Sequence, residues 1–264
     1  MGQLLYRIGL IALLLTIGLG SDFNYTVDPA LPAAGTLEEL RTSLQKQIGQ
    51  QADEINMDYN GDHQELSANF ADLLKHVFAA DDYVAYIVDS YLYTIRTWGG
   101  TARIKVTVRY RETVEQSHQV AELTGRVLPA ILVHGMPETD RIKAIHDWIV
   151  LHVAYDQSLQ RYTAYDAIES GKTVCQGYSL LAYRMLKEAG FQARIIEGTV
   201  DSGSHVWNLV QIGSEWYHMD VTWDDPIPDR EGRVSYNYFL KSDSEMKKDH
   251  QWVKSYPAAM NSKT

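Results

Sequence analysis

The sequence predicts a mixed α+β protein, because segments with helical spacing of apolar residues and segments of strict alternation follow one another along the chain. Two hairpin patterns carry the strands, one at residues 90–111 and the other at residues 204–222. Amphipathic helix patterns precede and separate the two hairpins. This order favours a small α/β domain over residues 36–130 and a second, α+β domain over residues 137–264.

Composition narrows the classes of function. The 264 residues are 45% hydrophobic, which is typical of globular proteins and excludes disordered and collagen-like chains. With 24 basic and 34 acidic side chains the formal net charge is −10, so neither nucleic acid nor an anionic membrane surface is an expected partner of the whole molecule. The single cysteine, Cys175, excludes an internal disulfide and cysteine-rich zinc sites. We also expect no metal and no cofactor.

The N-terminus is typical of an export signal. Residues 1–20 carry one charge, Arg7, followed by an apolar run from Ile8 to Leu19. The run has the length of a signal-peptide core and falls short of the roughly 20 residues of a membrane span. We predict an exported bacterial protein, extracellular or at the cell surface, with an uncleaved membrane anchor at residues 1–20 as the alternative. Residues 21–35 contain two prolines and no periodicity, which predicts a linker.

The predicted α/β domain begins with a capping box, because Thr36 and Glu39 precede apolar residues at helical spacing. A strand is expected over residues 52–59 and a second helix over about residues 65–79. The first hairpin turns at Trp98-Gly99-Gly100, and after the turn apolar and basic residues alternate. A solvated basic face is the simpler interpretation, and a docking surface for an anionic polymer is the alternative. The basic residues are Arg103, Lys105, Arg109 and Arg111.

Two histidines fall on a helix predicted over about residues 138–153. His146-Asp147 could be half of a metal-phosphohydrolase signature, but we find no matching second half. We therefore expect a surface or packing role for His146 and His152.

Cys175 lies where a helix start would activate it. Thr173 and Gln176 form a capping-box pattern, which predicts Thr173 as the N-cap and Cys175 as about the second helical residue. The first turn of a helix stabilises an anion and therefore favours a thiolate, and the backbone N–H of Cys175 is placed to donate to an oxyanion. Gly177 is predicted to keep the wall beside the sulfur bare. The alternative is that Cys175 is only a small buried apolar residue.

The second hairpin would supply the base. Gly213-Ser214 fits a two-residue turn, which places position 205 opposite 222 and position 207 opposite 220. His205 and Asp220 then lie on one face as diagonal neighbours, about 7–8 Å apart between Cα atoms, so their side chains can meet. Asn208 points to the opposite face.

A metal site is the rival interpretation of the same residues. A zinc ion held by Cys175, His205, His218 and Asp220 would need His218 close to His205, but His218 faces position 209, roughly 13 Å along the strand. An acidic cluster after the hairpin could hold a cation, although a solvated loop is favoured. The cluster consists of Asp224, Asp225, Asp229 and Glu231.

Three blocks in the order Cys, His, Asp resemble the transglutaminase-like superfamily: TVCQGYS at residues 173–179, SHVWNLV at 204–210 and WYHMDVTWDDP at 216–226. The similarity extends over roughly residues 137–250. It implies a papain-like α+β fold in which the cysteine-bearing helix packs against an antiparallel sheet.

The resemblance also implies roles for individual residues. Cys175 would be the nucleophile, His205 the general base and acid, and Asp220 the residue that orients His205. Trp223 would shield the His–Asp pair, with Trp207 and Gly177 in supporting positions. The second oxyanion donor stays unassigned, because Glu169 stands where the papain pattern has glutamine.

The implied function is a thiol-dependent acyl transfer. Cys175 would form a thioester from a peptide or glutamine-type amide, and either water would resolve it, as in a peptidase or amidase, or an amine would, as in a transglutaminase. Hydrolysis is favoured, with a protein, peptide or cell-wall substrate. The alternative is a catalytically silent binding or scaffold module.

Overall fold

The computed structural model describes residues 33–228, 230 and 232–263, and these divide into two compact units between Thr113 and Val114. The predicted signal peptide or anchor at residues 1–20 lies outside the described residues, as does the predicted linker except for residues 33–35. Within the described part of the chain, no helix is both long enough and apolar enough to cross a membrane.

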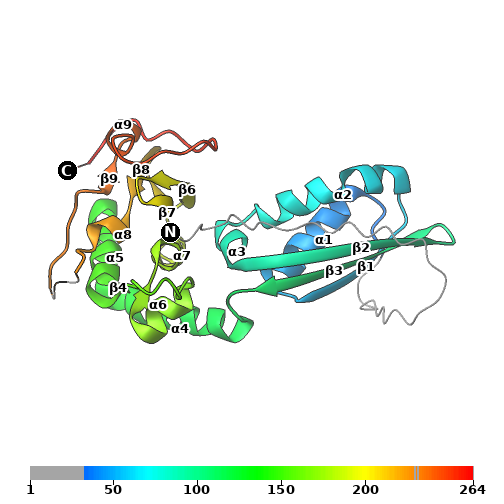
Figure 1. The fold of residues 1–264 in the computed structure, drawn as a ribbon, viewed down its shortest axis with the longest axis horizontal. Helices are drawn as coiled ribbons and strands as arrows, with labels where there is room; N and C mark the ends of the chain where they lie inside the picture. The colour runs from blue at the N-terminus through cyan, green and yellow to red at the C-terminus, as the bar shows by residue number, and fades with distance from the viewer. Residues whose placement is uncertain (1–32, 229, 231, 264) are drawn as a thin grey trace. The chain divides into compact units, whose positions relative to one another are not determined.

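The N-terminal unit is a three-stranded antiparallel sheet in the order β1-β3-β2, with α1 and α2 packed on one face (Figure 1). Its core is formed by apolar side chains from both helices and from the sheet face they cover. The elements are α1 (Leu37–Gly49), β1 (Glu54–Tyr59), α2 (His63–Phe78), α3 (Asp82–Ile87), β2 (Val88–Trp98) and β3 (Thr101–Tyr110).

Local signals explain most of these elements. The backbone N–H of Glu39 donates to Thr36 Oγ1 at 3.2 Å, so Thr36 caps α1 as predicted. The carboxylate of Glu39 accepts from Gly35 N instead of from the N-cap residue, so only half of the capping box forms. Gly99 and Gly100 take φ values of 56° and 88°, which fit the tight turn between β2 and β3.

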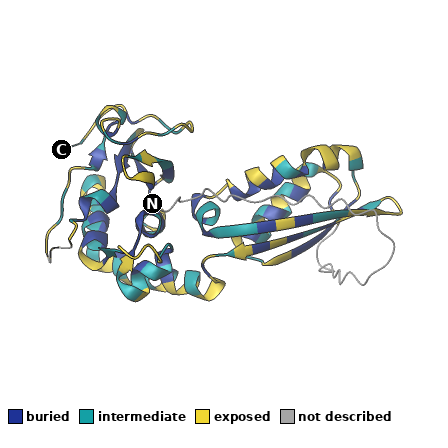
Figure 2. Cartoon of the chain, viewed as in Figure 1, coloured by how far each residue is buried: buried dark blue, intermediate teal, exposed yellow. Residues whose placement is uncertain are grey.

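The basic face of β3 is paired with acidic residues of the neighbouring strands. Lys105 Nζ lies 2.6 Å from Glu54 of β1, and Arg111 lies 2.9 Å from Asp89 of β2, which also pairs with Arg109. The alternate side chains of β3 from Ala102 to Val108 are buried, as the alternation predicts (Figure 2). The positive charge of this face is therefore partly neutralised within the sheet.

The C-terminal unit places helices around and against a four-stranded antiparallel sheet in the order β6-β7-β8-β9. Its elements are α4 (Val114–Ile131), α5 (Glu138–His152), β4 (Ala154–Tyr155), α6 (Ala164–Ser170), β5 (Lys172–Thr173), α7 (Cys175–Glu188), β6 (Ala193–Val200), β7 (Gly203–Ile212), β8 (Glu215–Met219), α8 (Val221–Asp224), β9 (Phe239–Lys241) and α9 (Asp243–Met246).

Helix α7 forms the centre of this unit. Its inner face packs against β6 and β7, and α4, α5 and α6 surround its other sides. The α+β class is thus confirmed, and the cysteine-bearing helix lies against the antiparallel sheet. Helix α4, which the sequence analysis placed in the first domain, packs with the second unit. Side chains of α7 that are fully buried include Leu180, Leu181, Met185 and Leu186, each contributing about 1.5–3 kcal/mol by burial.

Candidate active site

Helix α7 begins at Cys175 itself, one residue later than the predicted pattern required. Val174 is the N-cap residue and offers no side-chain hydrogen bond, so the predicted capping box with Thr173 as N-cap is wrong. Thr173 belongs to β5, where it pairs with Tyr155, and its Oγ1 donates to the carbonyl of Arg161 at 3.0 Å. Cys175 is 8% exposed at the first helical position, where the N–H groups of the first turn favour an anion.

Gly177 permits close packing between α7 and the segment before it. A Cβ at this position would lie 1.9 Å from Thr173 Oγ1 and 2.6 Å from the carbonyl oxygen of Thr163. This close approach, rather than an open wall beside the sulfur, is what requires glycine here.

Replacing Gly177 with alanine is expected to lower the free energy of unfolding by about 1–3 kcal/mol, because the new methyl group overlaps backbone that cannot move freely. The matched control is Gly125→Ala in α4, where nothing lies within 4 Å of the added Cβ and helix propensity should stabilise by up to about 1 kcal/mol. Urea unfolding of both variants is the measurement. Equal stability of the two variants would contradict the packing role of Gly177.

The register of the second hairpin is confirmed. Ile212 pairs with Glu215 across the Gly213-Ser214 turn, and the ladder continues to Asn208 opposite Met219. The strand ends there, whereas the sequence analysis extended it through residue 222. Asp220 instead caps α8, because its Oδ1 accepts from Trp223 N at 3.2 Å.

His205 of β7 meets Asp220 and Cys175. Its Nε2 donates to Asp220 Oδ2 at 2.7 Å, which leaves Nδ1 for the hydrogen bond with the Cys175 thiol. Burial is the largest influence and lowers the pKa of His205, but the Asp220 carboxylate and Cys175 outweigh it and raise the pKa to about 10. The imidazole is therefore protonated at neutral pH. Burial would raise the pKa of Asp220, but His205 and His250 hold it well below its usual range.

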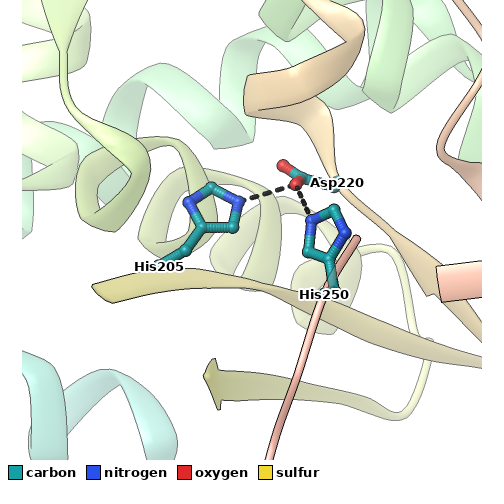
Figure 3. A group of neighbouring side chains, drawn as sticks. All are labelled: His205, Asp220 and His250. Atoms are coloured by element: carbon teal, nitrogen blue, oxygen red, sulfur yellow. Dashed lines mark hydrogen bonds and ion pairs between the residues drawn. The ribbon is translucent and has the colours of Figure 1, made fainter. Parts of the chain in front are cut away.

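A second imidazole contacts the same carboxylate. His250 Nε2 lies 3.1 Å from Asp220 Oδ2, and its Nδ1 lies 2.6 Å from Asp249 Oδ1. Figure 3 shows the two rings on either side of the Asp220 carboxylate. No sequence pattern indicates His250 as part of the site, because it follows Asp220 by 30 residues and belongs to neither strand of the hairpin. The adjacent acidic residue Asp249 was the only local signal.

Aromatic rings surround these two histidines. The ring centroid of Trp223 lies 5.8 Å from that of His205 and 4.5 Å from that of His250. Trp207 lies 5.8 Å and 4.9 Å from the same two rings and is fully buried. The His–Asp pair is thus enclosed by apolar surface, which strengthens its electrostatic interactions by excluding water.

The comparison with known families agrees with this geometry. Residues 127–221 match the family model of the transglutaminase-like superfamily, a segment that includes the cysteine, the histidine and the aspartate of the site. The chain contains a transglutaminase-like domain. The predicted resemblance is confirmed for this part of the chain.

Matches to individual proteins cover only part of each chain. The kyphoscoliosis peptidases of Homo sapiens and Mus musculus are each 29% identical to the chain over 143 residues, which are 46% of this chain and 22% of the relative. The chain thus spans about a fifth of the length of these curated relatives. A solved structure described as a TGase aligns with a TM-score of 0.39 and 15% identity, covering 69% of this chain and 54% of that chain.

Other polar residues of the transglutaminase-like domain have structural partners. His218 Nδ1 accepts from Trp207 Nε1 at 2.9 Å, so its Nε2 donates to Asp243 at 2.9 Å. Burial lowers the pKa of His218, in keeping with a neutral ring. Asn208 donates to the carbonyl of Ser179 on α7 at 3.1 Å and takes no part in the His–Asp contact.

The acidic cluster after the hairpin is not a solvated loop at its start. Asp224 and Asp225 are both buried; Asp224 accepts from His146 Nε2 at 3.1 Å, and Asp225 accepts from the hydroxyl of Tyr178. These contacts tie α8 to α5 and α7. The predicted packing role of His146 is confirmed, whereas Asp229 and Glu231 lie outside the described residues.

One group of side chains in the described part of the chain has the spacing of a metal site: His205, Asp220 and His250, whose ligand atoms lie within 4.8 Å of one another. Both imidazoles already lie within hydrogen-bond distance of the same carboxylate oxygen. These hydrogen bonds satisfy the hydrogen-bonding groups of His205, His250 and Asp220 that face one another. We therefore assign no metal or cofactor to these three residues. That the protein needs neither stays a prediction.

Proposed function

We propose that the transglutaminase-like domain is a thiol-dependent acyl-transfer enzyme acting on peptide or glutamine-type amides. The observation that carries the proposal is the position of His205, whose imidazole lies between the Cys175 thiol and the buried Asp220 carboxylate. A thiol, a base and an orienting carboxylate in this order are the parts that nucleophilic acyl transfer needs.

The proposed reaction follows from these parts. The Cys175 thiolate attacks the carbonyl carbon, and the first-turn backbone N–H groups of α7 stabilise the oxyanion. Protonated His205 gives its proton to the leaving amine as the C–N bond breaks, which leaves a thioester on Cys175. His205, now neutral, removes a proton from water or from an acceptor amine, whose attack on the thioester releases the acid or the new amide and restores the Cys175 thiolate and the protonated His205.

Hydrolysis is the favoured outcome. The curated relatives with 29% identity are named peptidases, which supports water as the acceptor. The transglutaminase outcome differs only in the acceptor, so one assay separates them: casein is incubated with a fluorescent amine, and peptide release is compared with amine incorporation.

We further propose that His250 positions Asp220. The His250 ring contacts the Asp220 oxygen that also accepts from His205. On its other side the same ring contacts Asp249, which fixes the orientation of His250. His250 therefore limits the motion of Asp220, and through it the orientation of the His205 ring.

Alkylation of Cys175 by iodoacetamide tests the proposal without a known substrate. The folded-state pKa of His205 is raised to about 10, so the imidazolium that stabilises a thiolate persists through neutral pH. We expect Cys175 to react at pH 6 at least about tenfold faster than free cysteine, whose thiolate fraction is small there because its pKa is about 8.5. Because the sequence has one cysteine, the modified site is unambiguous.

The control is His205→Gln, which removes the imidazolium and should return the rate to that of an ordinary thiol. If wild-type Cys175 reacts no faster than free cysteine, the enzyme proposal fails and the scaffold alternative replaces it.

Export to the cell surface, with a protein, peptide or cell-wall substrate, is part of the proposal. It is supported by the sequence pattern of residues 1–20. Fractionation of cells that express the full chain tests it, since recovery in the cytosol alone would contradict export.

A further inference from the structure

An open cavity of about 380 Å³ lies on the segment that precedes the cysteine-bearing helix. It is formed by β4, the loop that follows β4, and the start of β5. A smaller depression beside it shares Tyr155, Gln157 and Lys172 and adds Ala154 and Ile227. The residues that line the main cavity are Tyr155, Asp156, Gln157, Ser158, Arg161 and Lys172.

The cavity wall is joined directly to the residues before Cys175. Tyr155 pairs with Thr173, and the carbonyl of Arg161 accepts from Val174 N at 2.9 Å. Burial is the largest cause that raises the pKa of Tyr155 to about 12, and the charge of Cys175 is the next. The Tyr155 hydroxyl is thus protonated. Because Tyr155 pairs with Thr173, this wall of the cavity lies two residues from Cys175 along the chain.

The one carboxylate in this wall is already occupied. Asp156 accepts from Ser158 Oγ at 2.6 Å, from Gln160 N at 2.9 Å and from Arg161 N at 3.1 Å. These donors, the Ser158 hydroxyl first, lower the pKa of Asp156 to about 2. The carboxylate therefore stabilises its own loop, and its hydrogen-bonding capacity is largely used there.

The two cationic side chains of the wall, Arg161 and Lys172, have fewer polar partners than Asp156. The Arg161 side chain is 40% exposed, and its guanidinium reaches Asp156 only at 3.4 Å. Lys172 is exposed, and its ammonium has no ion pair with any residue that the structure describes. Two cations against one anion make the cavity locally positive in a protein whose formal net charge is −10.

We propose that this cavity is a subsite for a carboxylate of the peptide substrate, next to the amide that Cys175 attacks, with Lys172 and Arg161 as its cationic walls. The proposal rests on the proposed function, since the subsite serves the same thiol. An acidic side chain and a free C-terminal carboxylate share the required chemistry. The hydroxyl of Tyr155 supplies a polar edge for either one.

Peptidyl chloromethyl ketones that carry Glu, Gln or Lys beside the reactive ketone test the subsite on the full chain. Each reagent alkylates Cys175, so the rate of inactivation reports how well its side chain is accepted. We expect the Glu reagent to react about three- to tenfold faster than the Gln reagent, as for a partly exposed ion pair, and the Lys reagent to be slowest.

Lys172→Glu should abolish or reverse this preference. Because Lys172 is exposed, the variant should fold, and an unchanged iodoacetamide rate verifies that the thiol is intact. The matched control is Lys187→Glu in the last turn of α7, which makes the same change in net charge away from the cavity and should keep the wild-type preference.

A protection assay separates the two sources of carboxylate. Amidated peptides with an acidic side chain and neutral peptides with a free C-terminus are compared for slowing iodoacetamide alkylation, and the better protector identifies the source. If iodoacetamide reacts only at the rate of an ordinary thiol, the proposed function itself fails. If the thiol is reactive but Glu and Gln reagents do not differ and neither carboxylate peptide slows alkylation, or if Lys172→Glu leaves both effects unchanged, the subsite is overturned and the proposed function stands.

Discussion

Replacing Cys175 with alanine is expected to lower the rate of amide turnover by about 10⁴-fold or more, because the acyl group then has no atom to which it can transfer. The fold should persist, since the change removes one sulfur atom from a side chain at the edge of the core. The measurements are peptide release and amine incorporation with casein, together with circular dichroism and thermal unfolding.

The control for this variant is Ser179→Ala on the same helix. Ser179 Oγ donates to the carbonyl of Val206 at 3.0 Å, so the variant also removes one polar atom from α7, but outside the Cys–His–Asp group. We expect its turnover to stay within about tenfold of wild type, because it loses one ordinary hydrogen bond. Turnover by Cys175→Ala that matches this control would mean that the reaction does not pass through the thiol.

Asp220→Asn is expected to have the second-largest effect. The carboxylate accepts from His205, His250 and the backbone of Trp223, and an amide in its place puts N–H groups or a neutral oxygen against two imidazoles. Loss of one partner from such a buried group costs about 3–5 kcal/mol of stability. Turnover should fall by about 10³- to 10⁴-fold, because His205 is no longer held in the required tautomer and orientation.

His250→Gln distinguishes positioning from collapse of the fold. It leaves the contact between His205 and Asp220 in place, so we expect a smaller loss of turnover than in Asp220→Asn, with iodoacetamide alkylation still fast at pH 6. If alkylation in His250→Gln falls as far as in His205→Gln, His250 acts on the thiol itself and the positioning role is wrong.

The stability that this cluster contributes should depend on pH in a defined direction. The pKa of His205 is raised from 6.5 to about 10 on folding, so its contribution is fully present below about pH 6.5 and is lost as the pH rises towards 10. The pKa of Asp220 is lowered, so its contribution is present above about pH 4 and is lost as the pH falls. The difference in unfolding free energy between wild type and Asp220→Asn should therefore be largest between about pH 4 and 6.5.

Local signals predicted the hairpin more accurately than they predicted its surroundings. The two-residue turn at Gly213-Ser214 fixes the parity of side chains, and parity alone was enough to bring His205 towards Asp220. The end of the strand was missed, because the backbone N–H groups of α8 compete for Asp220 as a cap. The sequence around Asp220 is compatible both with the end of a strand and with a helix N-cap, and only the tertiary fold decides between the two.

The errors at the cysteine have the same origin. Thr173 has the sequence of an N-cap, but its pairing with Tyr155 directs the hydroxyl to the carbonyl of Arg161. No local pattern connects residues 155–161 to the cysteine, and none connects His250 to Asp220. Contacts between segments that are distant in the sequence form the cavity and bring the His250 imidazole to Asp220. The periodicity of apolar residues carries no information on such contacts.

Cys175 is the one cysteine of the 264 residues, and this affects how long its thiol survives oxidation. A thiolate at this site would also be the chain's most readily oxidised sulfur after exposure to peroxide, and its first oxidation product is a sulfenic acid. Within these residues no second thiol is present to condense with that acid and protect it as a disulfide. Recovery would therefore depend on a thiol supplied by another molecule, and without one further oxidation to sulfinic acid would be permanent.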